Sequence, residues 1–228
     1  LKHYSLEIQE SASETFEFLI STYYSRLITN DNSIKEKLSK IFKEVLHLSV
    51  NDDTIFVTRG YSMIVSHFPI DIIMEILNEV SVNLMKNCII KKVDNLESSN
   101  NDAETRRISV EAIAILIIKL LNLEVKDKNQ EIVEIIENFI VRLIECFNDY
   151  EIDKKLGDVG SKVRESCCKV FPSLFFCLSN NSKSLFNKYS LRFIKCILKQ
   201  LCEKMNKIRL QAGNSLQLFF DMIKYKLN

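Results

Sequence analysis

Apolar residues recur at spacings of three and four along almost the whole chain, which is the period of one face of an α-helix. In the stretch EIVEIIENFIVRLIECF they keep to one stripe, formed by Ile132, Ile135, Ile136, Phe139, Ile140, Leu143 and Ile144. The 228 residues contain only four glycines and two prolines, so they offer few of the turns that a sheet needs. No alternating strand pattern persists beyond a few residues. The sequence therefore predicts an all-α protein.

Clusters of polar residues mark the ends of the predicted helices. Pro69 suits the first turn of a helix, where no backbone N–H is needed, whereas Pro172 lies inside one and should kink or break it. The polar stretch KKVDNLESSNND at 91–102 predicts a surface loop. The predicted helices span 11–28, 33–48, 53–67, 69–91, 102–123, 129–148, 158–178, 183–203 and 205–226.

Charge and cysteine content argue against several classes of protein. Lys and Arg number 31 and Asp and Glu number 30, so no overall field attracts nucleic acid or an anionic membrane, and neither is expected as a partner. The seven cysteines all fall within apolar helical patterns without a Cys-x-x-Cys motif, which favours reduced, buried thiols. No signal peptide or membrane-spanning run is recognisable. Because the sequence begins at Leu1, we expect it to be a piece of a larger protein.

A nine-residue pattern recurs along the chain. It reads aliphatic or Thr, Arg, two free positions, a small residue, three free positions and a large apolar residue. Clear copies are TRRISVEAI, VRESCCKVF and IRLQAGNSL, and TRGYSMIVS is a weaker copy. Their arginines are Arg59, Arg106, Arg164 and Arg209, which lie 47, 58 and 45 residues apart.

Such periods are typical of helical-hairpin repeats of about 40–47 residues. The pattern predicts a right-handed α-solenoid of HEAT/armadillo-like helical hairpins. We expect about four to five hairpins in one segment over residues 1–228. A plain helical bundle with solvated arginines is the alternative.

Two of these arginines follow an acidic residue by six positions, as in Asp158–Arg164 and Glu203–Arg209. Six residues along one helix place two side chains roughly 240° apart, so they do not share a face. We therefore expect each arginine to reach the next repeat. Together with Arg106 they would form a ladder between repeats.

The stretch GDVGSKVRES contains two of the four glycines. Gly157 can take a positive φ, and Asp158 can cap the next helix. Gly160 in a first helical turn costs about 1 kcal/mol relative to alanine. We therefore expect something to pack against its bare backbone: a neighbouring repeat, a partner protein or a phosphate. A phosphate loop would need more glycine and a following Gly-Lys-Ser/Thr.

The segment DYEIDKKLGDVGSKVRES, residues 149–166, resembles a signature of the tubulin-folding cofactor D family. It shares the Asp-Tyr, the following Asp, the Gly-Asp-Val-Gly and the Val-Arg. It differs at Leu156, where the family tends to have arginine, and at Lys162, where an aromatic residue is common. Three further segments, TRGYSMIVSHFP, NDAETRRISVEAIAIL and KQLCEKMNKIRLQAGNSL, resemble the family in the same order, so the resemblance covers about residues 55–220.

The resemblance implies a C-terminal portion of a large cytosolic α-solenoid, with microtubule or centrosome association. It implies β-tubulin, tubulin cofactors C and E, and an Arf-like small GTPase as partners. The family supplies a scaffold, and the assembled complex stimulates GTP hydrolysis on β-tubulin. A different HEAT-repeat scaffold, such as a transport receptor or a phosphatase regulatory subunit, is the alternative.

Nothing in the sequence indicates catalysis, a metal site or a cofactor. His3, His47 and His67 lie far apart, and the carboxylates are scattered over polar helix faces. We instead expect residues 149–164 to form a ridge that faces a partner. Its expected contact residues are Asp149, Tyr150, Lys154, Lys155 and Lys162. The expected structural residues are Gly157, Asp158 and Gly160 in the loop, and Arg106, Arg164, Glu203 and Arg209 in the ladder.

Overall fold

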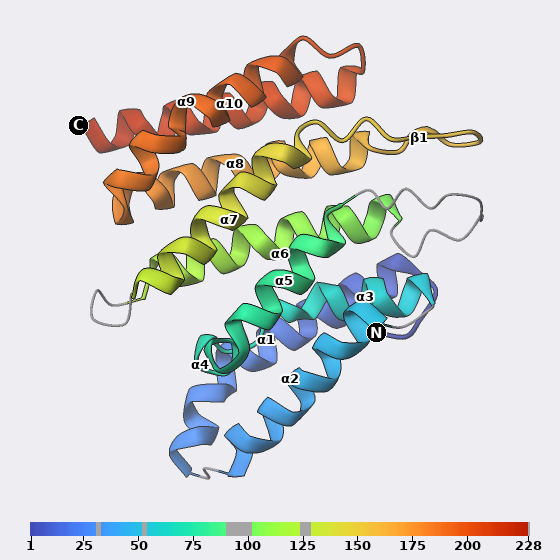
Figure 1. The fold of residues 1–228 in the computed structure, drawn as a ribbon, viewed down its shortest axis with the longest axis vertical. Helices are drawn as coiled ribbons and strands as arrows, with labels where there is room; N and C mark the ends of the chain where they lie inside the picture. Colours follow the sequence, from blue (N-terminus) through green and yellow to red (C-terminus); the bar gives the residue numbers. More distant parts are fainter. Residues whose placement is uncertain (31–32, 52–53, 90–101, 124–128, 228) are drawn as a thin grey trace. The chain divides into compact units, whose positions relative to one another are not determined.

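The computed structural model describes residues 1–30, 33–51, 54–89, 102–123 and 129–227, and these are nearly all helical, as the sequence predicts (Figure 1). The α-helices are α1 (Leu6–Asn30), α2 (Ser33–Asn51), α3 (Ile55–Val65), α4 (Ile70–Ile73), α5 (Leu77–Asn87), α6 (Ala103–Leu121), α7 (Gln130–Cys146), α8 (Ser161–Asn181), α9 (Lys183–Leu201) and α10 (Asn206–Leu227). Most of the predicted loop at 91–102 lies outside the described residues.

The helix predicted at 11–28 begins five residues earlier, at Leu6, and two further helices differ from the sequence-based expectation in how their backbone runs. The segment predicted as one helix over 69–91 is broken into α4, a 3₁₀ turn at Met74–Ile76 and α5. The backbone of Ile76 leaves the helical region, with φ −137° and ψ 34°. In contrast, α8 continues through Pro172, which was expected to kink or break it.

The tolerance of α8 for Pro172 has a specific explanation. A proline has no N–H, so the carbonyl four residues earlier, on Cys168, loses its helical partner. The buried hydroxyl of Ser215 on α10 donates to that carbonyl over 2.7 Å. A side chain from a neighbouring helix thus replaces the missing backbone hydrogen bond.

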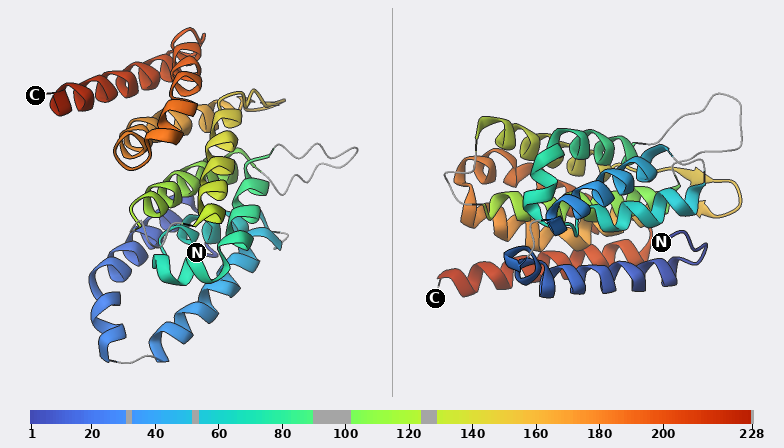
Figure 2. Two further views of the ribbon diagram at one scale, coloured as in Figure 1. Left: turned by 60° about the vertical axis from the view of Figure 1, so that its left-hand side comes forward. Right: turned by 90° about the horizontal axis from the view of Figure 1, so that it is seen from below.

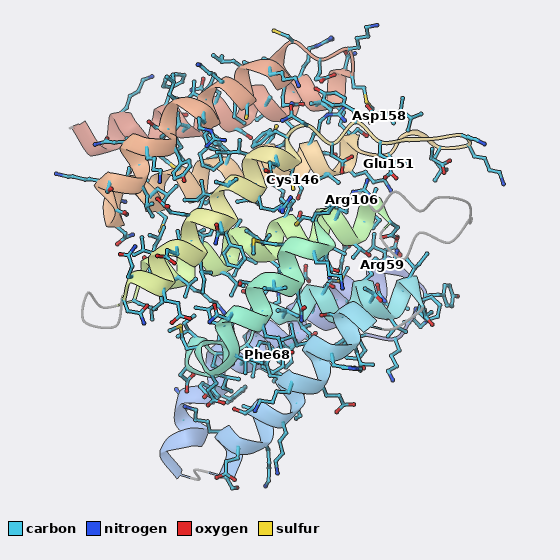
Figure 3. The ribbon with its side chains drawn as sticks, in the orientation of Figure 1. Arg59, Phe68, Arg106, Cys146, Glu151 and Asp158 are labelled. Carbon is cyan, nitrogen blue, oxygen red and sulfur yellow. The ribbon has the colours of Figure 1, made fainter. Side chains whose placement is uncertain are left out.

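The chain divides into two compact units, Leu1–Ala112 and Ile113–Asn228, with the boundary inside α6. In the first unit, α2 and α3 form a hairpin, α1 packs on α3, and α4 and α5 pack on α2. Phe68 lies at the centre of its core, with ring centroids 4.9 Å from Phe16 and 4.6 Å from Phe42 (Figure 3).

The second unit contains two helical hairpins, α7–α8 and α9–α10 (Figure 2). The first helices of the two hairpins pack on each other, and so do the second helices, because α7 contacts α9 and α8 contacts α10. Phenylalanines fill the space between α8, α9 and α10, namely Phe171, Phe175, Phe193 and Phe219. Like helices packed on like helices are the arrangement of a hairpin repeat.

The nine-residue sequence pattern falls at the same place in three helices. Arg106, Arg164 and Arg209 are each the fourth residue of their helix, in α6, α8 and α10. The small residues of the three copies, Ser109, Cys167 and Ala212, are buried. This common register is compatible with a repeat solenoid.

Within the described residues, no single helix has both the length and the apolar composition to cross a membrane. The bent pair Ile55–Val65 and Ile70–Asn87 meets that test by length and composition only.

Candidate functional site

A short β-hairpin joins α7 to α8 and projects from the helices of its unit (Figure 1). Strand β1 (Ile152–Asp153) pairs antiparallel with β2 (Gly157–Asp158), with Ile152 opposite Asp158 and Asp153 opposite Gly157. Gly157 has a φ of 76°, which confirms the predicted positive value. The hairpin was not predicted, although a three-residue loop followed by a left-handed glycine is a known hairpin pattern that the spacing Asp153–Gly157 fits.

Gly160 lacks a side chain because Asp149 occupies the space. A Cβ at this position would collide with both the carboxylate and the backbone carbonyl of Asp149. The expectation that something packs against this backbone is therefore met from within the chain. Asp149 itself is only 5% exposed, so its predicted role as an exposed contact residue is wrong.

Arg164 is completely buried, and its guanidinium closes the base of the hairpin. One terminal nitrogen donates to the backbone carbonyl of Asp149 and, over 3.2 Å, to Oδ1 of Asp158. The other lies 2.8 Å from Oδ2 of Asp158. The arginine thus forms a two-pronged ion pair, the arrangement in which a guanidinium fits a carboxylate best.

This pairing differs from the predicted ladder, in which Arg164 would reach the next repeat. The helical-wheel argument assumed that Asp158 and Arg164 lie on one helix. Asp158 instead lies in β2, before α8 begins at Ser161, so its carboxylate can turn back to the arginine. The same carboxylate accepts from the backbone N–H of Ser161, the first residue of α8, over 3.0 Å, although Gly160, and not Asp158, stands at the N-cap position.

The charge of Arg164 is maintained by its neighbours. Burial on its own lowers the pKa of a guanidinium, because the charged form loses its hydration. The hydrogen bond and negative charge of Asp158, with the charge of Glu203, act in the opposite direction and raise the pKa of Arg164 above its ordinary value. The ion pair therefore holds the two strands and the start of α8 together.

Tyr150 connects this base to the next hairpin. The Arg164 guanidinium carbon lies 4.1 Å from the centroid of the Tyr150 ring, and Lys199 Nζ lies 4.8 Å from it. The tyrosine hydroxyl donates to the carboxylate of Glu203. Both cations lie within the distance at which an aromatic face attracts them.

The end of α9 supports the same loop through two further hydrogen bonds. Lys199 Nζ donates to Asn148 Oδ1 over 2.8 Å, and the buried Gln200 side chain donates to the carbonyl of Phe147 over 3.0 Å. A link between repeats therefore exists here, but α9 and Glu203 supply it. The sequence-based reasoning missed Lys199 and Gln200, which belong to no repeated pattern.

The remaining predicted residues lie in three different settings. Lys154, Lys155 and Lys162 are exposed, the first two at the tip of the hairpin and the third on the first turn of α8. Arg209 is exposed and donates to the backbone carbonyls of Glu203 and Lys204 in the loop before its own helix. Arg106 is buried on α6.

In the described part of the chain, no group of three or more His, Cys, Asp or Glu side chains is placed to hold a metal ion. Around Arg164 both terminal nitrogens of the guanidinium are bonded, whereas its buried Nε has no hydrogen-bond partner among the described residues, and the carboxylate of Asp158 serves the arginine and the start of α8. The arrangement presents a projecting β-hairpin whose base is fixed by an ion pair and hydrogen bonds.

The two helical hairpins packed on each other in the second unit are compatible with a helical-repeat protein. A family model described as "Tubulin folding cofactor D C terminal" matches residues 191–225. Tubulin-specific chaperone D from Dictyostelium discoideum is 28% identical over 250 aligned residues, which cover 92% of this chain. The chain spans 16% of that relative's length. No solved structure matches this chain. The resemblance to the C-terminal region of tubulin-folding cofactor D is thereby confirmed.

Proposed function

We propose that this chain is a scaffold segment of a tubulin-folding cofactor, which binds β-tubulin and helps to assemble or dissociate the α/β-tubulin heterodimer. The observation that carries the proposal is the match to tubulin-specific chaperone D over 92% of the chain. The matching family model, at residues 191–225, covers the second part of α9 and most of α10 in the unit that contains the β-hairpin.

The proposed partners beyond β-tubulin are tubulin cofactors C and E and an Arf-like small GTPase. In this proposal the chain itself is not catalytic, and any stimulation of GTP hydrolysis belongs to the assembled complex. The protein acts in the cytoplasm, with microtubule or centrosome association. A continuous right-handed stack of hairpins would provide the extended surface that such an assembly needs.

Within the chain, residues 149–164 are proposed as the segment that faces a partner. Its base is rigid, because Arg164, Asp158 and Tyr150 hold it against α8 and the end of α9. A surface that is already ordered loses less conformational freedom on binding than a mobile one. The structural residues therefore contribute to binding indirectly, by fixing the exposed ones.

Co-purification tests this function. The full-length protein, carrying an affinity tag, is isolated from cytosol and its bound proteins are identified by mass spectrometry. We expect α- and β-tubulin together with the other tubulin cofactors. Recovery of transport cargo or of phosphatase subunits, without tubulin, would show that the chain belongs to a different helical-repeat scaffold.

A further inference from the structure

The tip of the β-hairpin, residues 152–156, exposes two large aliphatic side chains. The accessible fraction is 75% for Ile152 and 78% for Leu156, the highest values among the large aliphatic side chains whose burial the structure describes. Contact of such side chains with water is unfavourable, and removing them from water favours association. Single exposed apolar residues are common on surfaces, but here two lie together on a projecting element.

The tip is held in one conformation by its own hydrogen bonds. Oδ1 of Asp153 accepts from the backbone N–H of Lys155 over 2.7 Å and from that of Leu156 over 2.8 Å. These two bonds are the main cause of a lowered pKa at Asp153, because they favour the ionised carboxylate. The aliphatic side chains therefore project from a preorganised loop.

The acidic residues around the tip are used within the chain. Asp149 is buried, Asp153 accepts from the tip backbone, and Asp158 pairs with Arg164. Lys154 and Lys155, by contrast, are exposed and form no ion pair within the described residues. Lys154 and Lys155 outnumber the one exposed carboxylate of the tip, that of Asp153, so the outward chemistry of residues 152–156 is apolar with a net positive charge.

We propose that the hairpin tip docks into a shallow apolar depression on an acidic protein surface, with Ile152 and Leu156 entering the depression and Lys154 and Lys155 facing carboxylates at its rim. This arrangement matches the usual anatomy of a protein interface, which has an apolar centre and a polar rim. The proposal rests on the proposed function, since tubulin is the partner that would carry this surface.

A protein partner fits the tip better than a membrane does. The carboxylate of Asp153 lies between the two aliphatic residues in sequence and is fixed there by the loop, so inserting both side chains into a bilayer would also take this charge out of water. The apolar area also consists of two side chains only, which is small for an interfacial anchor. A compact pocket in a protein can enclose both.

The test uses the full-length protein and purified tubulin, with binding measured by microscale thermophoresis. One variant combines Ile152→Ser and Leu156→Ser, and the other combines Lys154→Glu and Lys155→Glu. Matched controls on the exposed surface of α9 are Leu191→Ser and the pair Lys183→Glu and Lys195→Glu. We expect Kd to rise about tenfold or more for each tip variant and less than about twofold for the controls.

The dependence of Kd on ionic strength separates the contribution of the two lysines from that of the two aliphatic side chains. Binding of the unmodified protein should weaken as salt is added, and the lysine variant should lose most of this dependence because exposed charge pairs are screened. The serine variant should keep it. Urea unfolding midpoints equal to that of the unmodified protein would show that the tip variants fold normally.

Three other outcomes would each contradict the tip proposal or the proposed function. If the unmodified protein binds tubulin and the tip variants bind equally well, the tip proposal is overturned while the proposed function stands. If the unmodified protein does not bind tubulin, the proposed function is overturned, and the tip proposal with it. If the tip variants lose binding only to phosphatidylserine vesicles, the tip is a membrane contact and the proposal is wrong.

Discussion

The buried side chain of Arg164 fixes the base of the β-hairpin and thereby positions the exposed residues of that hairpin. Its guanidinium contacts the carboxylate of Asp158, the carbonyl of Asp149 and the face of Tyr150. A lysine could carry the charge but could not satisfy two carboxylate oxygens and a ring face at once. The position therefore requires arginine for its shape as well as for its charge.

Replacing Arg164 by alanine should lower the free energy of unfolding by about 3 kcal/mol, because a buried carbonyl and a carboxylate would lose their partner. Arg164→Lys should recover less than half of that loss. Urea denaturation followed by circular dichroism measures both. A loss below about 0.5 kcal/mol for the alanine variant would show that the ion pair is not structural.

Ser215 offers a second prediction at the residue scale. Ser215→Ala should cost about 1–2 kcal/mol of stability, because the Cys168 carbonyl beside Pro172 would be buried without a donor. In a Pro172→Ala background the new backbone N–H can reach that carbonyl, so the same serine change should cost about 1 kcal/mol less. A double-mutant cycle measured by urea denaturation gives this coupling, and strict additivity would contradict it.

At the scale of elements, the helices were predictable and the hairpin was not. A long amphipathic helix such as α7 repeats its apolar period several times, so its limits were predicted to within two residues. Strands of two residues contain no period at all. The break at Ile76 was missed for a related reason, since the side-chain pattern stays helical while the backbone departs.

In the candidate site, only the features that depend on local backbone conformation could be predicted from the sequence. The positive φ of Gly157 and the crowding at Gly160 follow from the cost of glycine at those positions. The burial of Asp149 and the support from Lys199 and Gln200 depend on which hairpins pack together. Tertiary contacts of that kind cannot be predicted from the residue pattern of a short polar segment.

Gly160 and Gly213 both lie at helical positions but have different neighbours, so the same change to alanine should have opposite effects on stability. Gly160→Ala should destabilise the protein by about 2 kcal/mol or more, because the new methyl group meets Asp149. Gly213→Ala lies inside α10, where the nearest atom is 3.7 Å away, and should stabilise by about 0.5–1 kcal/mol. Thermal unfolding of the two variants side by side checks the sign, and a shared sign would contradict the assigned contact.

At the scale of the whole molecule, the reactivity of the buried cysteines reports on the opening of each unit separately. Cys88 lies in the first unit, and Cys167 and Cys168 lie in the second; all three are buried, whereas Cys202 is exposed. Burial raises the pKa of Cys168 to about 12, so only about one molecule in ten thousand carries its thiolate at pH 8. Since the thiolate is the reactive form, this cysteine should react only when its unit opens.

Labelling with N-ethylmaleimide under native conditions should therefore modify Cys202 first, within the time expected of an exposed thiol. Cys167 and Cys168 should follow together, at a rate that rises when Arg164→Ala lowers the stability of their unit, while the labelling of Cys88 stays unchanged. Mass spectrometry of the modified peptides resolves each site. Because the chain divides into two compact units, an equal acceleration at Cys88 would mean that they unfold together. The base of the β-hairpin would then stabilise far more of the chain than its own contacts suggest.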